Sequence, residues 1–113
     1  MKLTRSKTYE VNGRTITMER YEGKRRSHGK WVDCKVSCTK IEGLKNIDFF
    51  MENDFGNRCA TFSIETLNEE ERKIIANGKE ELLTIEDDCE LVHKSGILED
   101  IEVAYSDWYG VKF

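Results

Sequence analysis

Hydrophobic and polar residues alternate over much of the first 64 positions, and this pattern predicts β-strands. Ile16 and Met18 alternate with polar neighbours, and the dipeptide Asn12-Gly13 precedes them. Asn-Gly is the strongest two-residue hairpin signal, because a type I′ turn needs a positive φ at both central positions. Residues 7–21 are therefore predicted to form a β-hairpin.

Two further segments show the same alternation. Residues 47–64 predict a second hairpin around the turn-forming residues 53–57. Residues 30–41 predict a strand, one face of which carries Val32, Cys34, Val36 and Cys38. Because side chains on one face of a strand share one environment, both cysteines are expected to point toward the core.

One helix is predicted between Thr66 and Gly78. Thr66 and Glu69 have the spacing of a capping box, and Gly78 stands where a glycine commonly ends a helix. After Gly78 the alternation returns, for example at Ile101, Val103 and Tyr105, and predicts further strands. The expected fold is α+β and a single domain over residues 1–113: a mainly antiparallel hairpin meander of about six strands with one short helix.

Charge is distributed unevenly along the chain. The net charge is −4, but residues 1–46 carry twelve Lys or Arg and five Asp or Glu, whereas residues 47–113 carry six and seventeen. Such asymmetry is informative about binding partners and not about the fold. The simpler interpretation is that the two halves neutralise each other on the folded surface.

The acidic density peaks in residues 79–93. Read as a strand, this segment would present carboxylates at a repeat of ~6.5–7 Å, close to the spacing of phosphates in nucleic acid. Such a surface could occupy a Lys- and Arg-lined groove of a partner protein. The carboxylates are Glu80, Glu81, Glu86, Asp87, Asp88 and Glu90. The commoner outcome of this composition is a solvated acidic face.

A basic segment, residues 22–30, is predicted to be a loop between Gly23 and Gly29. Its Lys24, Arg25 and Arg26 could grip phosphate or an acidic protein patch, although most short basic runs are solvated loops. One alternative function is therefore a small nucleic-acid-binding module that uses the basic N-terminal half. A sequence pI of about 5.3 disfavours direct nucleic-acid binding unless the positive face is well segregated.

Cysteine and histidine suggest a second alternative, a zinc-stabilised structural domain. Cys34 and Cys38 form one pair and Cys89 and His93 another, which gives the four ligands that zinc takes. On straight strands, however, residues four apart are ~13 Å from each other. Zinc would be the only cofactor implied. Otherwise the cysteines are small buried hydrophobic residues.

The remaining sequence features argue against catalysis and membrane insertion. The chain has no nucleophile-elbow, zinc-protease or phosphate-loop motif, so we expect no enzymatic activity. It has no apolar run near the ~20 residues of a transmembrane helix and no signal peptide, so we expect a cytoplasmic protein without membrane contact.

In general character the chain resembles the phage-encoded anti-CRISPR inhibitors directed at Cas9-type effectors. The resemblance lies in size, composition, the absence of catalytic motifs and the acidic run from Glu80 to Glu90. It implies a stoichiometric, non-catalytic inhibitor, encoded by a phage or mobile element, that acts in the cytoplasm of a bacterial host. The partner would be a nucleic-acid enzyme with a basic surface, such as a Cas9-type nuclease.

Overall fold

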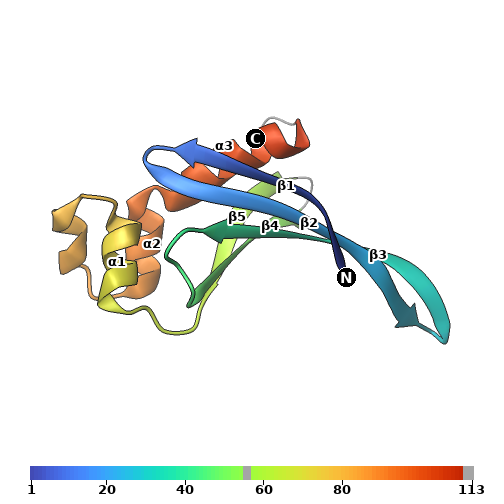
Figure 1. The fold of residues 1–113 in the computed structure, drawn as a ribbon. Coiled ribbons are helices and arrows are strands. Elements are labelled where there is room, and N and C mark those ends of the chain that lie inside the picture. The colour runs from blue at the N-terminus through green and yellow to red at the C-terminus, as the bar shows by residue number, and fades with distance from the viewer. Residues whose placement is uncertain (55–56, 111–113) are drawn as a thin grey trace.

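The structure, a computed structural model, describes residues 1–54 and 57–110. Within them the fold is α+β, with a sheet followed in the chain by helices (Figure 1). The strands are β1 (Lys2–Val11), β2 (Arg14–Ser27), β3 (Lys30–Ile41), β4 (Ile47–Asp54) and β5 (Asn57–Ile64). The helices are α1 (Glu69–Ala76), the 3₁₀ helix η1 (Glu80–Thr84), α2 (Asp88–Ser95) and α3 (Ile97–Tyr109).

The sheet is antiparallel with the order β1-β2-β3-β4-β5, which confirms the predicted meander. Asn12 and Gly13 have φ values of 51° and 80°, as a type I′ turn requires. A second such turn, at His28 (φ 49°) and Gly29 (φ 78°), joins β2 to β3. The predicted basic loop over residues 22–30 is therefore wrong: β2 and β3 stay paired up to these two residues. The turn predicted over residues 53–57 includes residues 55 and 56, which lie outside the described part.

The buried face of the sheet is set by cross-strand register. Ile16 pairs with Ile41 and Met18 with Thr39, and all four are buried. Side chains of directly paired residues share a face, so the odd positions of β3 face the core. The even positions, including Cys34 and Cys38, point to the uncovered face, and the expectation that they face the core is wrong.

Helix α3 covers the buried face and contacts β1, β2 and β5. Ile97, Ile101, Ala104 and Trp108 are buried at helical spacing, whereas Val103 is 58% exposed. The strands predicted after Gly78 are therefore wrong. The described residues form five strands and three α-helices, instead of about six strands and one helix.

Helix α1 starts two residues later than predicted. Its N-cap is Asn68, whose side chain accepts a hydrogen bond from the Glu71 backbone N–H at 2.8 Å. The Glu71 carboxylate accepts from the Asn68 backbone N–H, which completes a capping box. Thr66 and Glu69 have the same sequence spacing, but Glu71 is buried and Glu69 is exposed, and burial selects the pair that is used.

A buried ion pair joins the first hairpin to the helices. Arg14 Nε lies 2.9 Å from Asp100 Oδ2, and both side chains are at least nine-tenths buried. The Arg14 guanidinium also donates to the carbonyl oxygens of Ile74, Ile75 and Ser95, at the C-terminal ends of α1 and α2. A cation at helix C-termini and an anion in the first turn of α3 both complement the helix dipoles.

A second buried carboxylate anchors the β3–β4 connection. Glu71 accepts hydrogen bonds from the backbone N–H groups of Lys45 and Asn46 and from the Asn46 side chain, at 2.7–3.0 Å. Burial alone would raise the pKa of Glu71. The hydrogen bonds from Asn46, Lys45 and Asn68 outweigh burial and lower the pKa from 4.5 to about 2.

Replacing Asp100 by Asn should lower the free energy of unfolding by about 3–5 kcal/mol, because it leaves the buried Arg14 charge without its partner. Asp107→Asn is a matched control on the same helix: Asp107 also accepts from a cation at 2.9 Å, but its side chain is 58% exposed. The control should lose about 0–1 kcal/mol. Urea unfolding measures both, and equal losses would contradict the proposed importance of the buried pair.

Glu71→Gln should lower the free energy of unfolding at neutral pH by about 1–3 kcal/mol, because buried donors lose a charged acceptor. Since the pKa of Glu71 is about 2 folded and 4.5 in its ordinary state, the unfolded chain binds more protons between these values. Stability from Glu71 is thus present above pH 4.5 and is lost as pH falls toward about 2. As pH falls from 4.5 toward about 2, the melting temperature of Glu71→Gln should decrease less steeply than that of the exposed control Glu70→Gln.

Candidate functional site

The two charged segments lie at opposite ends of the molecule. The described residues extend 52 × 29 × 28 Å. The paired ends of β2 and β3 project at one end, and α1, η1 and α2 form the other end (Figure 1). We call residues 20–37 the basic hairpin and residues 79–94 the acidic end. The fold therefore separates the basic hairpin from the acidic end, as a positive binding surface on an acidic protein requires.

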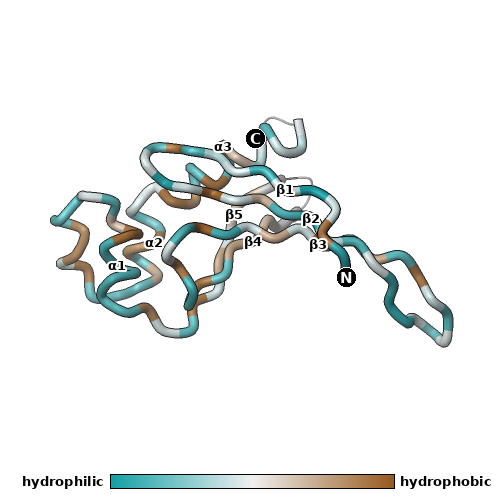
Figure 2. Tube along the Cα trace, in the orientation of Figure 1, coloured by the Kyte–Doolittle hydropathy of each residue, from teal (hydrophilic) through white to brown (hydrophobic). Residues whose placement is uncertain are grey.

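The basic hairpin carries six Lys or Arg against two acidic residues. Lys24, Arg25 and Arg26 are all exposed, and Trp31 is 67% exposed with the Arg26 guanidinium 5.8 Å from its ring centre. Figure 2 shows the projecting chain as mostly hydrophilic with short hydrophobic stretches. Exposed Trp and Arg are the residue types that most often dominate the energy of protein interfaces.

One face of this hairpin has an exposed apolar row. Leu3 pairs with Tyr21, and Tyr21 pairs with Val36, so the three side chains lie side by side across β1, β2 and β3. Leu3 is 45% and Val36 is 40% exposed. The sequence pattern placed Val36 on one face of its strand and assigned that face to the core, because alternation identifies a face without indicating what covers it. It did not indicate that Leu3 and Tyr21 lie beside Val36.

The acidic end is helical, so its predicted strand spacing is wrong. Glu80 and Glu81 lie in η1, and Glu86 lies in the connection before α2. Asp87 is the N-cap of α2, and its side chain accepts from the backbone N–H groups of Cys89 and Glu90 at 2.8 and 3.3 Å. A regular strand repeat that imitates successive phosphates is therefore not available.

Some of the six predicted carboxylates have structural partners. Asp88 pairs with Arg72 of α1, and Glu90 pairs with Lys94 at 2.8 Å one helical turn away. In the described part of the chain, Glu80, Glu81 and Glu86 form no ion pair, and all three are exposed. These three carboxylates are the ones free to meet a partner.

The connection that carries Glu86 is held in place by Arg72. Its guanidinium donates to the Asp88 carboxylate and to the Ile85 carbonyl oxygen. The Ile85 N–H in turn donates to the Leu82 carbonyl oxygen at 3.1 Å and closes η1. The free carboxylates are thus presented on a preorganised segment, which lowers the entropy cost of binding.

The predicted zinc ligands lie on two separate elements. Cys34 and Cys38 lie on β3, and Cys89 and His93 lie on α2. The His93 ring packs edge-on against the Phe62 ring, with 5.2 Å between the ring centroids. Residues four apart on a helix share a face, so the ~13 Å separation expected for a strand does not apply to Cys89 and His93. Among the residues with described positions, no group of three or more His, Cys, Asp or Glu is arranged to hold a metal ion.

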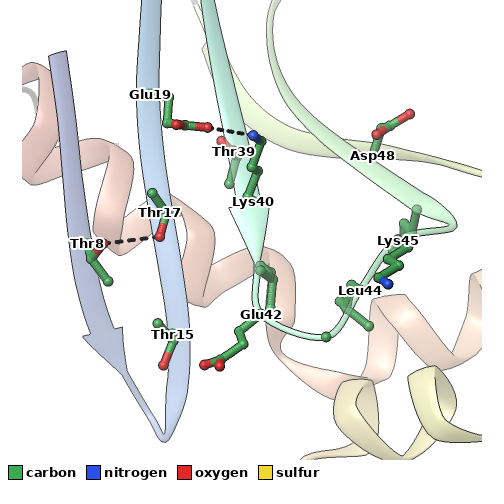
Figure 3. Close-up of a pocket in the computed structure, with 13 residues that line it drawn as sticks. Thr8, Thr15, Thr17, Glu19, Thr39, Lys40, Glu42, Leu44, Lys45 and Asp48 are labelled. Atoms are coloured by element: carbon green, nitrogen blue, oxygen red, sulfur yellow. Dashed lines mark hydrogen bonds and ion pairs between the residues drawn. The ribbon is translucent and has the colours of Figure 1, made fainter. Parts of the chain in front are cut away.

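The sequence did not indicate a groove on the uncovered face of the sheet (Figure 3). It has a volume of about 730 Å³ and opens where β3 and β4 are paired only at Thr39 and Phe49. Lys40 and Glu19 form an ion pair of 2.8 Å at its wall, which holds the pKa of Lys40 above its ordinary value. None of the residues predicted to bind a partner or metal lines this groove.

Comparisons of this chain with protein-family models, with curated proteins and with solved structures give no match. Over residues 1–54 and 57–110, no helix has the length and apolar character needed to span a membrane.

Metal analysis of the purified protein tests the zinc hypothesis. We expect well below one zinc per chain, because Cys34 and Cys38 lie ~13 Å apart on an extended strand and two sulfurs on one zinc lie within about 4 Å. Chelator should leave thermal unfolding unchanged. One zinc per chain in the wild type, lost in the double variant Cys89→Ser/His93→Ala, would contradict this expectation.

Proposed function

We propose that this chain is a non-catalytic binding protein that inhibits a nucleic-acid enzyme by placing its acidic end in a basic groove of that enzyme. The observation that supports the proposal best is the set of three exposed carboxylates, Glu80, Glu81 and Glu86, that form no ion pair among the described residues. Enzymes that bind nucleic acid carry Lys- and Arg-lined grooves, which are complementary to such a surface.

The opposite charges of the two ends orient the molecule as it approaches its partner. A basic groove attracts the acidic end and repels the basic hairpin, so the molecule is oriented before contact. Association of this kind is fast at low ionic strength and weakens as salt is added. The resemblance to inhibitors of Cas9-type effectors makes a purified Cas9-type nuclease the first partner to test.

Reversing the three free carboxylates together, Glu80→Lys, Glu81→Lys and Glu86→Lys, should weaken inhibition of DNA cleavage by the nuclease roughly tenfold or more. Asp87 and Asp88 stay unchanged, because they cap α2 and pair with Arg72, and their loss would disturb the fold. The measurement is the concentration of protein that halves cleavage, at low and at physiological salt.

Two matched variants serve as controls. Reversal of three exposed carboxylates elsewhere, Glu42, Asp48 and Glu65, changes net charge equally and should leave inhibition nearly unchanged. Reversal of Lys24, Arg25 and Arg26 inverts the net charge of the basic hairpin and should not weaken inhibition, because the carboxylates of the acidic end stay in place. Equal loss in the two carboxylate variants would contradict a site at the acidic end. Loss in the hairpin variant alone, with a gel shift of duplex DNA by the wild type, would assign nucleic-acid binding instead.

A further inference from the structure

The outer edge of β3 lacks a neighbouring strand over most of its length. In the described part of the chain, β3 pairs with β4 only at Thr39 and Phe49, and the β2–β3 hairpin projects beyond the rest of the sheet toward its turn (Figure 1). Over residues 30–38, β2 is the only strand that pairs with β3 among the described residues. Free edges of this kind are templates for pairing with another strand. The edge is therefore a candidate interaction surface.

The turn at His28 and Gly29 determines which backbone groups point outward. In a two-residue hairpin the flanking residues, Ser27 and Lys30, exchange hydrogen bonds, and hydrogen-bonded pairs then recur at every second position. The Glu42 N–H, which donates to the Thr15 carbonyl oxygen at 3.2 Å, follows the same alternation. The outward N–H and C=O groups consequently belong to the odd positions: Trp31, Asp33, Lys35 and Ser37.

The side chains along this edge are complementary to themselves. Asp33 and Lys35 are both exposed and carry opposite charges two residues apart. On the other face, Val32 is 36% and Val36 is 40% exposed. A strand that runs antiparallel to an identical strand meets the same residues in reverse order, so each of these pairs can match itself across a two-fold axis.

We propose that the β3 edge pairs antiparallel with the β3 edge of a second copy of this chain, about a two-fold axis at Cys34. Asp33 then lies opposite Lys35 of the second copy, and Val32 lies opposite Val36 of the second copy. The outward backbone groups of Asp33 and Lys35 form the hydrogen-bonded pairs, and the two Cys34 residues form a non-hydrogen-bonded pair. The two sheets are thereby joined through their β3 strands, with β2 next to β3 in each copy.

Charge selects this register over its neighbours. A shift by one hydrogen-bonded pair in either direction places Asp33 opposite Asp33 or Lys35 opposite Lys35, and like charges directly opposite each other are destabilising. A shift by a single residue brings outward backbone groups against inward ones and cannot form the ladder. The central register is the one that pairs both charges with their opposites.

The pairing also continues the rows that each hairpin already contains. Lys24 pairs with Asp33 in register, and Lys35 lies 3.6 Å from Glu22. One row of alternating charge would then cross the axis. It starts with Lys24 and Asp33 of the first copy and continues with Lys35 and Glu22 of the second copy. On the uncovered face, Val32 would extend the apolar row formed by Val36, Tyr21 and Leu3 of the second copy.

The extent of the free edge fits this arrangement. Lys30 of the second copy lies opposite Cys38, so the paired stretch in each copy is residues 30–38 and ends one residue before Thr39, which pairs with Phe49 of β4. The two acidic ends point away from the axis and stay accessible. The dimer is therefore closed, compatible with the proposed function and independent of it.

Sedimentation equilibrium of two charge variants tests the register. In Asp33→Lys the new lysine lies opposite Lys35 of the second copy, and in Lys35→Asp the new aspartate lies opposite Asp33 of the second copy. Like charges then face each other, so each variant alone should dimerise at least about tenfold more weakly than the wild type. In an equimolar mixture the introduced charges meet opposite charges at both positions, and heterodimers should form. A mixture that stays monomeric while the wild type dimerises would overturn the register, and a wild type monomeric at the highest concentration reached would overturn the dimer.

Cross-linking at Cys34 gives an independent measurement. In a non-hydrogen-bonded pair the two Cα atoms lie about 4.5 Å apart, within the range that a disulfide needs. Copper-phenanthroline should join the two Cys34 thiols, each of which gives up one proton and one electron to the oxidant. The covalent dimer should form equally well in Cys38→Ser, Cys59→Ser and Cys89→Ser and be lost in Cys34→Ser. A cross-link that persists in Cys34→Ser would overturn the proposed axis.

Discussion

The buried ion pair between Arg14 and Asp100 is the interaction on which the arrangement of this protein depends. Arg14 begins β2, and its guanidinium binds carbonyl groups in the last turns of α1 and α2 as well as a carboxylate in the first turn of α3. Taking these charges out of water is costly, and the hydrogen bonds around them offset that cost. One side chain thereby fixes where three helices sit relative to the sheet.

That arrangement supports the two ends of the molecule differently. At the acidic end, Arg14 and Glu71 anchor α1 to the sheet, and Arg72 holds the connection to α2. The free carboxylates are thus carried on a fixed scaffold. The basic hairpin leaves the core and is held by pairing between β2 and β3, so it keeps an unused edge and exposed apolar side chains. The first end suits electrostatic docking, and the second suits strand pairing.

The turn at residues 12–13 and the strands over residues 7–21 and 30–41 were predicted correctly because their signals are local, whereas the loop predicted over residues 22–30 and the buried face predicted for β3 were wrong. Asn12-Gly13 forms the expected turn, and the alternating segments are strands in a meander. Residues 79–109 were predicted as strands because Ile101, Val103 and Tyr105 alternate, although Val103 is exposed and the buried set follows helical spacing through Ile97, Ile101 and Trp108. The missed signals were the N-cap at Asp87 and the junction at Gly96, which closes α2 and opens α3.

By itself, the sequence determined the strand meander, the tight turn at Asn12-Gly13 and the separation of basic from acidic segments, because turn conformation and charge are properties of neighbouring residues. The tertiary structure decided which face of β3 is buried, which carboxylates remain unpaired and that the charged segments lie at opposite ends. These outcomes depend on contacts between residues distant in the chain, such as Arg14 with Asp100 and Arg72 with Asp88. The local sequence pattern does not indicate which distant residues will be in contact.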